Sequence, residues 1–382
     1  MRNISVSHNT RRRCLNTVCA AERGGKEIKM KKLRIGIIGT GNISHCHMAG
    51  YKRLSDRVEV VAACDIDEAK LHGYCKQYGI PSEYTDYNEM LRKEELDCVS
   101  VCTWNAEHKG ATIAALRGGA NVLCEKPMAM NAEEAEEMQK ASEETGKLLQ
   151  IGFVRRFGND ADALKQFIGA GTFGDIYYAK ATYLRRNGCP GGWFGDKSKS
   201  GGGPLIDLGV HVIDLVRYLA GLPKPISAYG SCYSNLGPNR AGGGNKGWTV
   251  ETKNDPYSVE DFTTALIKFD SGLTLSVEAS FNLNIKKDIG NIELFGTNAG
   301  CRIDPELEIY TQLAGRFVNV SPADSTALSF NGLFEREILG FIDAVSGISP
   351  CRAPAEDGVE LMRIIDAIYE SAVTGKAVEI QR

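Results

Sequence analysis

The sequence lacks several features that mark specialised classes of protein. No stretch approaches the ~20 apolar residues that a membrane-spanning helix needs, so we expect no membrane partner. The formal net charge is −3, without the basic excess of a dedicated nucleic-acid-binding protein, so we expect no nucleic-acid partner. The 42 glycines follow no period, which excludes a collagen-like chain. These absences leave a soluble globular protein, and 382 residues predict two domains.

The 12 cysteines also lack a recognisable pattern. None forms a Cys-x-x-Cys pair, so neither a zinc ribbon nor a thioredoxin-like motif is predicted. Several, such as Cys102 and Cys124, lie within apolar runs, where a free thiol acts as a small buried side chain. Because no export signal is recognisable, we expect a reducing, cytoplasmic location.

Residues 1–29 differ from the rest of the chain in charge and pattern. They hold seven Lys or Arg against two Glu and show no hydrophobic periodicity. Arg11–Arg13 is weakly similar to a twin-arginine signal, but no apolar segment of about 7–15 residues follows. Met30 directly precedes a strand pattern. We therefore predict that residues 1–29 are a disordered extension or the result of a misassigned start codon.

Strand and helix patterns alternate between residues 30 and 150. Strands are predicted at 33–38, 58–64, 98–103, 121–124 and 148–153, and helices at 42–54, 67–78, 86–92, 109–118 and 132–145. Strands that alternate with helices predict βαβ units and a parallel sheet with helices on both faces. We expect an α/β, Rossmann-type dinucleotide-binding domain over residues 30–150.

The pattern changes after residue 150. Strands are predicted at 176–184, 226–233, 262–269, 273–282 and 291–296, and helices at 161–169, 204–219, 334–345 and 357–373. Two glycine-rich loops, 188–203 and 237–247, interrupt this region. Successive strands without helices between them favour antiparallel pairing. We expect residues 151–382 to form an α+β domain with a mostly antiparallel sheet.

The segment after the first strand has the pattern of a phosphate-binding loop. Gly39–Ser44 fits the G-x-G-x-x-G/A position between strand and helix, with Ser44 as the third small residue. Gly39 permits the tight turn, Gly41 permits close approach of a pyrophosphate, and the helix N-terminus supplies free N–H groups. The residues predicted to bind the dinucleotide here are Gly39, Thr40, Gly41, Asn42 and Ile43.

The end of the second strand bears on the choice of cofactor. Asp65 follows Gly41 by 24 residues, close to the offset of the acid that binds the adenosine ribose. Its carboxylate would accept hydrogen bonds from ribose hydroxyls and repel a 2′-phosphate, and no Arg follows in Ile66 or Asp67. This pattern favours NAD over NADP. The alternative is that Asp65 is a strand-end turn residue.

Two further segments carry candidate catalytic groups. Glu125, Lys126 and Pro127 end an apolar strand, at the sheet edge where ligands of such folds bind. A lysine there can hydrogen-bond a substrate hydroxyl and favour its alkoxide. Asp207 and His211 are four residues apart on one predicted helical face. His211 suits proton abstraction, with Asp207 orienting it or binding a second hydroxyl, although alone it also fits a packed core residue.

Together these segments resemble the Gfo/Idh/MocA family of nicotinamide-dependent sugar and polyol oxidoreductases, over about residues 33–380. The matching segments are 37–44, 119–127, 152–157, Asp207-x-x-x-His211 and 354–358. The resemblance implies Lys126, Asp207 and His211 as the catalytic group. It also implies an open, mostly antiparallel second sheet that buries its face in a homodimer or homotetramer.

One loop departs from the family pattern Thr-Pro-Asn-x-x-His. Here residues 103–108 place Trp104 where the family has proline, which puts a large ring near the cofactor and leaves the nicotinamide position open. The matching positions make Thr103, Asn105 and His108 predicted cofactor contacts, together with Glu125 and Lys126.

The remaining candidates concern substrate and metal. Arg155 and Arg156 either clamp a substrate oxygen or pair with carboxylates. Arg185 and the loop that contains Trp193 and Phe194 either bind and close over a sugar ring or form a structured surface loop. His45 and His47 are two apart on a helix and point to different faces, so no metal site is predicted. His47 is expected to line the cofactor cleft.

The function predicted from these residues is NAD-dependent oxidation of a secondary hydroxyl on a cyclic polyol or pyranoside. By resemblance the substrate is an inositol or a glucoside oxidised at C3, with hydride transfer to nicotinamide. One alternative is an NAD-dependent glycosidase that oxidises C3 transiently and cleaves by elimination. The other is a non-catalytic NAD-binding regulator, which would have no need of Lys126, Asp207 and His211.

Overall fold

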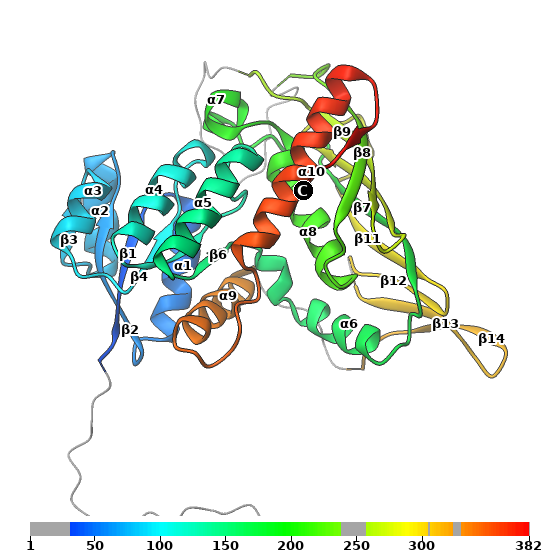
Figure 1. The fold of residues 1–382 in the computed structure, drawn as a ribbon, viewed down its shortest axis with the longest axis horizontal. Helices are drawn as coiled ribbons and strands as arrows, with labels where there is room; N and C mark the ends of the chain where they lie inside the picture. Colours follow the sequence, from blue (N-terminus) through cyan, green and yellow to red (C-terminus); the bar gives the residue numbers. More distant parts are fainter. Residues whose placement is uncertain (1–30, 238–256, 305, 324–329, 382) are drawn as a thin grey trace, which may run out of the picture. The chain divides into compact units, whose positions relative to one another are not determined.

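The structure is a computed structural model that describes residues 31–237, 257–304, 306–323 and 330–381 (Figure 1). The predictions for residues 1–29 and for most of the loop at 237–247 lie outside these ranges. Among the helices within them, none combines the length and apolarity that crossing a bilayer requires.

The first sheet is parallel, as predicted, with the strand order β3-β2-β1-β4-β5-β6. Its strands are β1 (Leu33–Ile38), β2 (Val58–Cys64), β3 (Ser82–Tyr84), β4 (Cys98–Val101), β5 (Asn121–Cys124) and β6 (Leu149–Ile151). All four residues of β4 are buried, as expected of a strand covered on both faces. The three-residue strand β3 was not predicted, because none of its side chains is fully buried and so it carries no apolar pattern.

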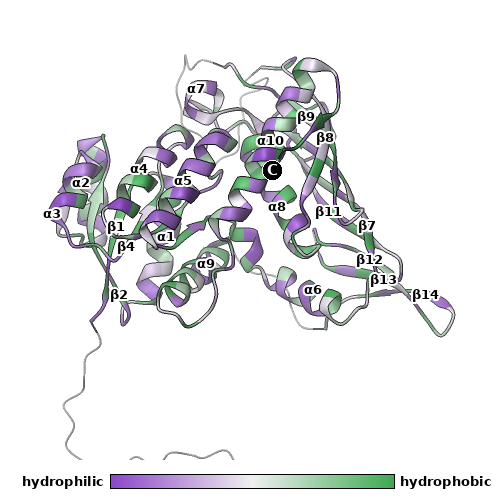
Figure 2. Cartoon of the chain, viewed as in Figure 1, coloured by the Kyte–Doolittle hydropathy of each residue, from purple (hydrophilic) through white to green (hydrophobic). Residues whose placement is uncertain are grey.

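Helices cover both faces of this sheet. They are α1 (Asn42–Arg53), α2 (Glu68–Tyr78), α3 (Tyr87–Lys93), α4 (Asn105–Arg117) and α5 (Ala132–Thr145). Successive strand residues such as Val122 and Leu123 face different cores, one formed with α3, α4 and α5 and the other with α1 and α2. Figure 2 shows hydrophilic and hydrophobic residues mixed along α2 and α5, as expected of helices with one face on a core.

The α1 side of the sheet is completed by a segment from near the end of the chain. Helix α9 (Phe330–Val345) contributes Ile338, Phe341 and Ile342 to the core beside α1 and α2. Figure 1 shows α9, in orange, beside α1, in blue. A helix predicted to belong with the second region therefore packs on the first sheet.

Within the described ranges the second sheet has nine strands in the order β14-β13-β12-β11-β7-β10-β9-β8-β15. All its pairings are antiparallel except β7 with β10, which confirms the predicted mostly antiparallel sheet. The strands are β7 (Ile176–Leu184), β8 (Pro225–Tyr233), β9 (Phe262–Phe269), β10 (Thr274–Ser280), β11 (Ile289–Gly296), β12 (Ala299–Arg302), β13 (Glu308–Leu313), β14 (Arg316–Val320) and β15 (Val378–Glu379). The last four were not predicted, because they are short and partly exposed.

Helices α8 (Val210–Leu219) and α10 (Ala355–Thr374) cover one face of the second sheet. Helix α6 (Asn159–Gly169), the short helix α7 (Lys197–Ser200) and the 3-10 turns Val154–Phe157 and Gly192–Gly195 lie in the connections. Residues 204–219 were predicted as one helix. The structure instead has a π-helical turn at Leu205–Gly209 that leads into α8, and such turns often mark functional sites.

Candidate active site

The phosphate-loop glycines have the geometry that a dinucleotide requires. Gly39 has a φ of +90°, and a Cβ there would lie 2.6 Å from the carbonyl oxygen of Cys102. A Cβ at Gly41 would meet only the Lys70 Nζ, at 3.8 Å, so space remains above the loop. No side chain in the described part of the chain caps the start of α1. The loop therefore offers free N–H groups at a helix N-terminus, which fits a pyrophosphate.

Asp65 is tied to this loop. Its Oδ2 accepts hydrogen bonds from the Thr40 N–H at 2.7 Å and the Thr40 hydroxyl at 2.8 Å, with the Lys70 Nζ at 3.5 Å. Burial acts to raise the pKa of Asp65, but the bonds from Thr40 and Asp67 and the charge of Lys70 outweigh it and leave the pKa lowered. Asp65 is therefore a carboxylate at neutral pH, beside the loop where a ribose would lie.

The loop after β4 contributes to the same wall. Thr103 and Asn105 line the cleft, and the Thr103 Oγ1 is buried without a hydrogen-bond partner among the described residues. Asn105 Nδ2 donates to the Ser200 carbonyl at 2.7 Å. Trp104 does not line the cleft, and its φ of −74° is one that proline adopts. The φ at Trp104 is therefore compatible with the proline of the family pattern.

His108, predicted as a cofactor contact, has both ring nitrogens close to backbone carbonyl oxygens. It is 1% exposed, with Nδ1 2.7 Å from the Pro127 carbonyl oxygen and Nε2 3.2 Å from that of Thr103. It is not among the residues that line the cleft. His108 holds the loop after β4 against the segment after β5.

The cleft itself has an empty volume of about 920 Å³, a figure that includes space open to solvent. Its walls come from both sheets and from α9. The lining residues are Ile43, Thr103, Asn105, Glu125, Lys126, Gly152, Val154, Tyr183, Arg185, Pro190, Trp193, Phe194, Asp207, Leu208, His211, Phe330 and Phe334.

The three predicted catalytic residues meet in this cleft. The Lys126 Nζ lies 2.7 Å from the Asp207 Oδ1 and 3.1 Å from the Asp207 carbonyl oxygen. His211 is half-buried one turn further along the helix. Burial lowers its pKa well below the usual value, and the charges of Lys126, Arg155 and Arg185 lower it further. His211 is therefore a neutral imidazole at neutral pH, able to accept a proton.

The glycines before this helix allow it to pack closely. A Cβ at Gly202 would lie 2.0 Å from the Tyr369 hydroxyl oxygen, and one at Gly203 would lie 2.3 Å from the Glu260 carbonyl oxygen. The buried Glu260 carboxylate accepts hydrogen bonds from the Gly203 N–H at 2.9 Å, the Leu205 N–H at 3.3 Å and the Tyr369 hydroxyl at 2.9 Å. Glu260 thus anchors the turn that carries Asp207. Sequence analysis missed it, because no motif links it to a helix more than 50 residues away.

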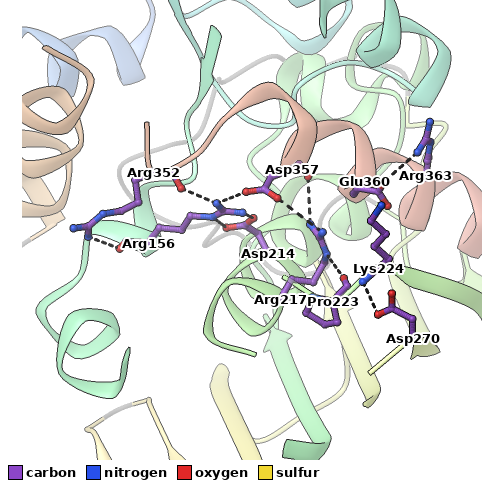
Figure 3. Close-up of polar contacts among 10 residues, drawn as sticks. All are labelled: Arg156, Asp214, Arg217, Pro223, Lys224, Asp270, Arg352, Asp357, Glu360 and Arg363. Carbon is purple, nitrogen blue, oxygen red and sulfur yellow. Dashed lines mark hydrogen bonds and ion pairs between the residues drawn. The ribbon is translucent and has the colours of Figure 1, made fainter. Parts of the chain in front are cut away.

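The two neighbouring arginines lie in different surroundings. Arg156 is fully buried and donates to both oxygens of Asp214 at 2.9 and 2.6 Å and to Asp357 at 2.7 Å (Figure 3). It does not line the cleft, so its position favours the carboxylate-pairing alternative. Arg155 pairs with Asp304 at 3.1 Å and acts on the site through its charge.

Arg185, Trp193 and Phe194 form the opposite wall of the cleft. The Trp193 and Phe194 rings stack with centroids 3.9 Å apart. The Arg185 guanidinium lies 5.3 Å from the centroid of the Tyr183 ring. This wall presents aromatic surface and one cation to whatever occupies the cleft.

The two histidines of α1 point apart, as predicted. His45 Nδ1 lies 2.6 Å from the Tyr78 hydroxyl. His47 is fully buried, does not itself line the cleft, and has its Nε2 2.9 Å from the Glu125 Oε1. His47 therefore supports a residue of the cleft wall from behind.

The chain is similar to known oxidoreductases in both sequence and structure. A family model described as "Oxidoreductase family, NAD-binding Rossmann fold" matches residues 33–153, and one described as "GFO/IDH/MocA C-terminal domain" matches residues 161–302. D-glucoside 3-dehydrogenase of Escherichia coli (strain K12) is 35% identical over 350 residues, covering 91% of this chain and 97% of that protein. For 1,5-anhydro-D-fructose reductase of Ensifer adhaerens the identity is 29% over 354 residues, covering 91% and 98%.

The structure of levoglucosan dehydrogenase in complex with NADH and levoglucosan matches with a TM-score of 0.80 and 23% sequence identity. The match covers 92% of this chain and all of that one, which shows that the fold is shared. The two family models and the 35% identity over most of both chains establish more than the fold. The chain belongs to the Gfo/Idh/MocA family and is an oxidoreductase with an NAD-binding Rossmann domain.

Proposed function

We propose that the protein is an NAD-dependent dehydrogenase that oxidises a secondary hydroxyl of a sugar ring, with the C3 hydroxyl of a glucoside as the favoured substrate. One observation carries this proposal. Lys126, Asp207 and a neutral His211 line the same cleft, and this cleft is also lined by Ile43 next to the phosphate loop. In this arrangement residues 30–150 bind the cofactor and residues 151–382 bind the substrate.

The three residues divide the work of alcohol oxidation. His211 accepts the hydroxyl proton, because its lowered pKa leaves the imidazole neutral. The Lys126 ammonium donates a hydrogen bond to the developing alkoxide and stabilises its negative charge. Asp207 holds Lys126 at 2.7 Å and has a second oxygen available for a neighbouring hydroxyl. Bound nicotinamide supplies the hydride acceptor for this chemistry.

The cofactor proposed is NAD, with Gly39, Thr40, Gly41, Asn42 and Ile43 around the pyrophosphate. Asp65 supports NAD over NADP, because a carboxylate beside the ribose site repels a 2′-phosphate. Thr103, Asn105, Glu125 and Lys126 are proposed as contacts on the nicotinamide side.

The proposed substrate class rests on the opposite wall. The stacked Trp193 and Phe194 rings offer a flat apolar surface of the kind that packs on the C–H face of a pyranose. Arg185 adds a hydrogen-bond donor for ring hydroxyls. The similarity to a D-glucoside 3-dehydrogenase favours a glucoside over an inositol.

The open face of the second sheet is proposed as the homodimer or homotetramer interface. On strands β8 and β9 this face exposes Tyr229, Tyr233 and Leu266, which are 47%, 43% and 49% exposed. An apolar face of this kind is stabilised when a second copy covers it.

The test is reduced-nicotinamide absorbance with NAD and a panel of aryl glucosides, C-linked glucosides, free sugars and inositols, with Lys126→Ala as the blank. Signal with glucosides that is lost in the variant supports the proposal, and signal confined to inositols would reassign the substrate. Release of free sugar without net NADH would identify a glycosidase that recycles its cofactor. Absence of both, with NAD still bound, would point to a regulator.

A further inference from the structure

A buried polar cluster lies behind the catalytic lysine. It consists of His47 from α1, Glu125 after β5 and Glu337 from α9, whose ligand-type atoms all lie within 4.8 Å of one another. His47 and Glu337 are fully buried and Glu125 is 5% exposed. The cluster therefore joins the first sheet to a helix from near the end of the chain.

Most hydrogen bonds in this cluster form one directional chain. The Tyr51 hydroxyl lies 2.7 Å from the Ser100 Oγ, which lies 3.1 Å from the His47 Nδ1. If Tyr51 donates to Ser100 and Ser100 donates to His47, the His47 Nε2 carries the proton and donates to the Glu125 Oε1 at 2.9 Å. The Glu125 Oε2 accepts from the Lys126 backbone N–H at 3.1 Å. Both Glu125 oxygens thus accept hydrogen bonds, and these bonds fix the backbone of Lys126.

Glu337 stands outside this chain. Both its carboxyl oxygens are buried and have no hydrogen-bond partner among the described residues. The titratable groups that face it are Glu125, His47, Tyr51 and Cys102. Burial raises the pKa values of Tyr51 and Cys102 well above their usual range, so both are neutral near pH 7. No cation among the described residues pairs with Glu337, so a second carboxylate here would face Glu125 uncompensated.

We propose that Glu337 remains protonated at neutral pH and is a positioning residue, whose neutral carboxyl lets Glu125 keep its bonds to His47 and to the backbone of Lys126. Burial together with the negative charge of Glu125 raises the pKa of Glu337 well above its usual value, in agreement with this assignment. A divalent cation is the competing occupant. The hydrogen-bond chain disfavours it, because with Tyr51 and Ser100 as donors the His47 Nε2 donates to Glu125 and has no lone pair for a cation. The catalytic consequence rests on the proposed function, whereas the protonation state does not.

The first experiment compares the free energy of unfolding of the wild type, Glu337→Gln and Glu335→Gln as a function of pH. Glu335 lies on the same helix but is partly exposed and pairs with Arg53, which makes it a matched control. Above about pH 5 the unfolded chain has lost the proton of Glu337 while the folded wild type keeps it, so wild-type stability falls as pH rises. The unfolding equilibrium constant of the wild type should rise tenfold per pH unit relative to Glu337→Gln. Parallel curves for these two proteins would overturn the assignment.

Two further measurements keep the proposal testable if Glu337→Gln does not fold. Infrared spectra of the wild-type protein at pH 8 should retain the C=O stretch of one protonated carboxyl, and its absence would contradict the proposal. Metal analysis of the purified protein should find no stoichiometric Zn²⁺ or Mn²⁺. A bound ion whose removal by EDTA lowers stability would overturn the proposal and show that a cation, not a proton, neutralises Glu337.

The positioning role has its own readout. Glu337→Gln should keep wild-type turnover at neutral pH, because its side chain is neutral like the protonated Glu337. At high pH, where Glu337 ionises and repels Glu125, the kcat of the wild type should fall below that of Glu337→Gln with little change in KM. Equal kcat values at high pH would overturn the positioning role and leave the protonation result intact. If neither the variants nor the wild type oxidises any substrate, the proposed function fails, and the stability and infrared results still decide the state of Glu337.

Discussion

The two walls of the cleft are built in different ways. The wall proposed to bind the cofactor, here the cofactor wall, adjoins a loop whose decisive features are backbone N–H groups and missing side chains, as at Gly39 and Gly41. On the wall proposed to bind the substrate, here the substrate wall, they are side chains from separate elements, such as Arg185, Trp193 and His211. Few residue types fit a position that needs an unusual φ or close backbone approach, whereas many side chains can replace one another in a cleft wall on the same fold. A local sequence motif therefore predicts the class of cofactor but does not predict the substrate.

The largest expected effect comes from the residue that joins the two walls. Lys126→Ala should lower turnover by about 10²–10⁴-fold, because it removes the donor that stabilises the alkoxide. NAD affinity, measured by calorimetry, should persist, because the phosphate loop is untouched. Lys199→Ala removes an exposed lysine that pairs with Asp196 and serves as the control. Near-normal turnover of Lys126→Ala would contradict the assignment.

Two glycines of equal φ can separate the effect of backbone strain from the effect of a steric clash beside the cofactor wall. Gly39 and Gly119 both have a φ of +90°, but a Cβ at Gly119 would meet nothing within 4 Å. Gly119→Ala should lower the free energy of unfolding by about 1–3 kcal/mol through backbone strain alone. Gly39→Ala should cost more, because its Cβ would also clash with the Cys102 carbonyl 2.6 Å away, and it should weaken NAD binding. Denaturant unfolding measures both variants, and equal losses would show that the clash is relieved.

Features that depend on local sequence were predicted better than features that depend on contacts between distant segments. Strands β1, β2 and β5 and helix α5 begin and end where predicted, because their apolar periods and caps are local signals. The pairing of Lys126 with Asp207 was predicted only as a shared site, through motifs that the family pattern joins.

Residues that act over long sequence distances were not predicted. Glu260 anchors the turn that carries Asp207, and Glu337 meets Glu125, through contacts between segments far apart in the chain. Neither residue belongs to a spacing pattern, so only the fold brings them to the site. Arg156 shows the converse, because its pattern left two roles open and the buried carboxylates around it favour the structural one.

On the substrate wall a smaller effect is expected. Trp193→Ala should raise KM for a glucoside about tenfold with little change in kcat, because ring stacking contributes about 0.5–1.5 kcal/mol beyond area burial and does not touch the reacting atoms. Trp193→Phe should recover part of the loss. Phe317→Ala removes an aromatic side chain that is 87% exposed on β14 and should leave KM unchanged. A fall in kcat without a change in KM would place Trp193 in the chemistry instead.

The smallest effect tests whether charge behind the substrate wall tunes the base. The proposed mechanism requires neutral His211, so kcat/KM should fall as pH decreases through the His211 pKa. Because burial and the charges of Lys126, Arg155 and Arg185 lower that pKa, activity should persist below the usual histidine range. Arg155→Gln removes one of the cations, so the pKa should rise and the acid limb should move to higher pH.

The His211 pKa of Arg155→Gln should return only part of the way to the usual histidine value, because burial and the charge of Lys126 still lower it. The control is Arg186→Gln, which removes an exposed arginine whose backbone N–H bonds to Asp288 and which does not act on His211. Arg155 does not line the cleft, so KM at high pH should stay unchanged while the acid limb moves. A shift in the acid limb without a shift in KM separates electrostatic tuning of the base from substrate binding. An unmoved limb would mean that the ion pairs of Arg155 with Asp304 and Asp160 already neutralise its charge at His211.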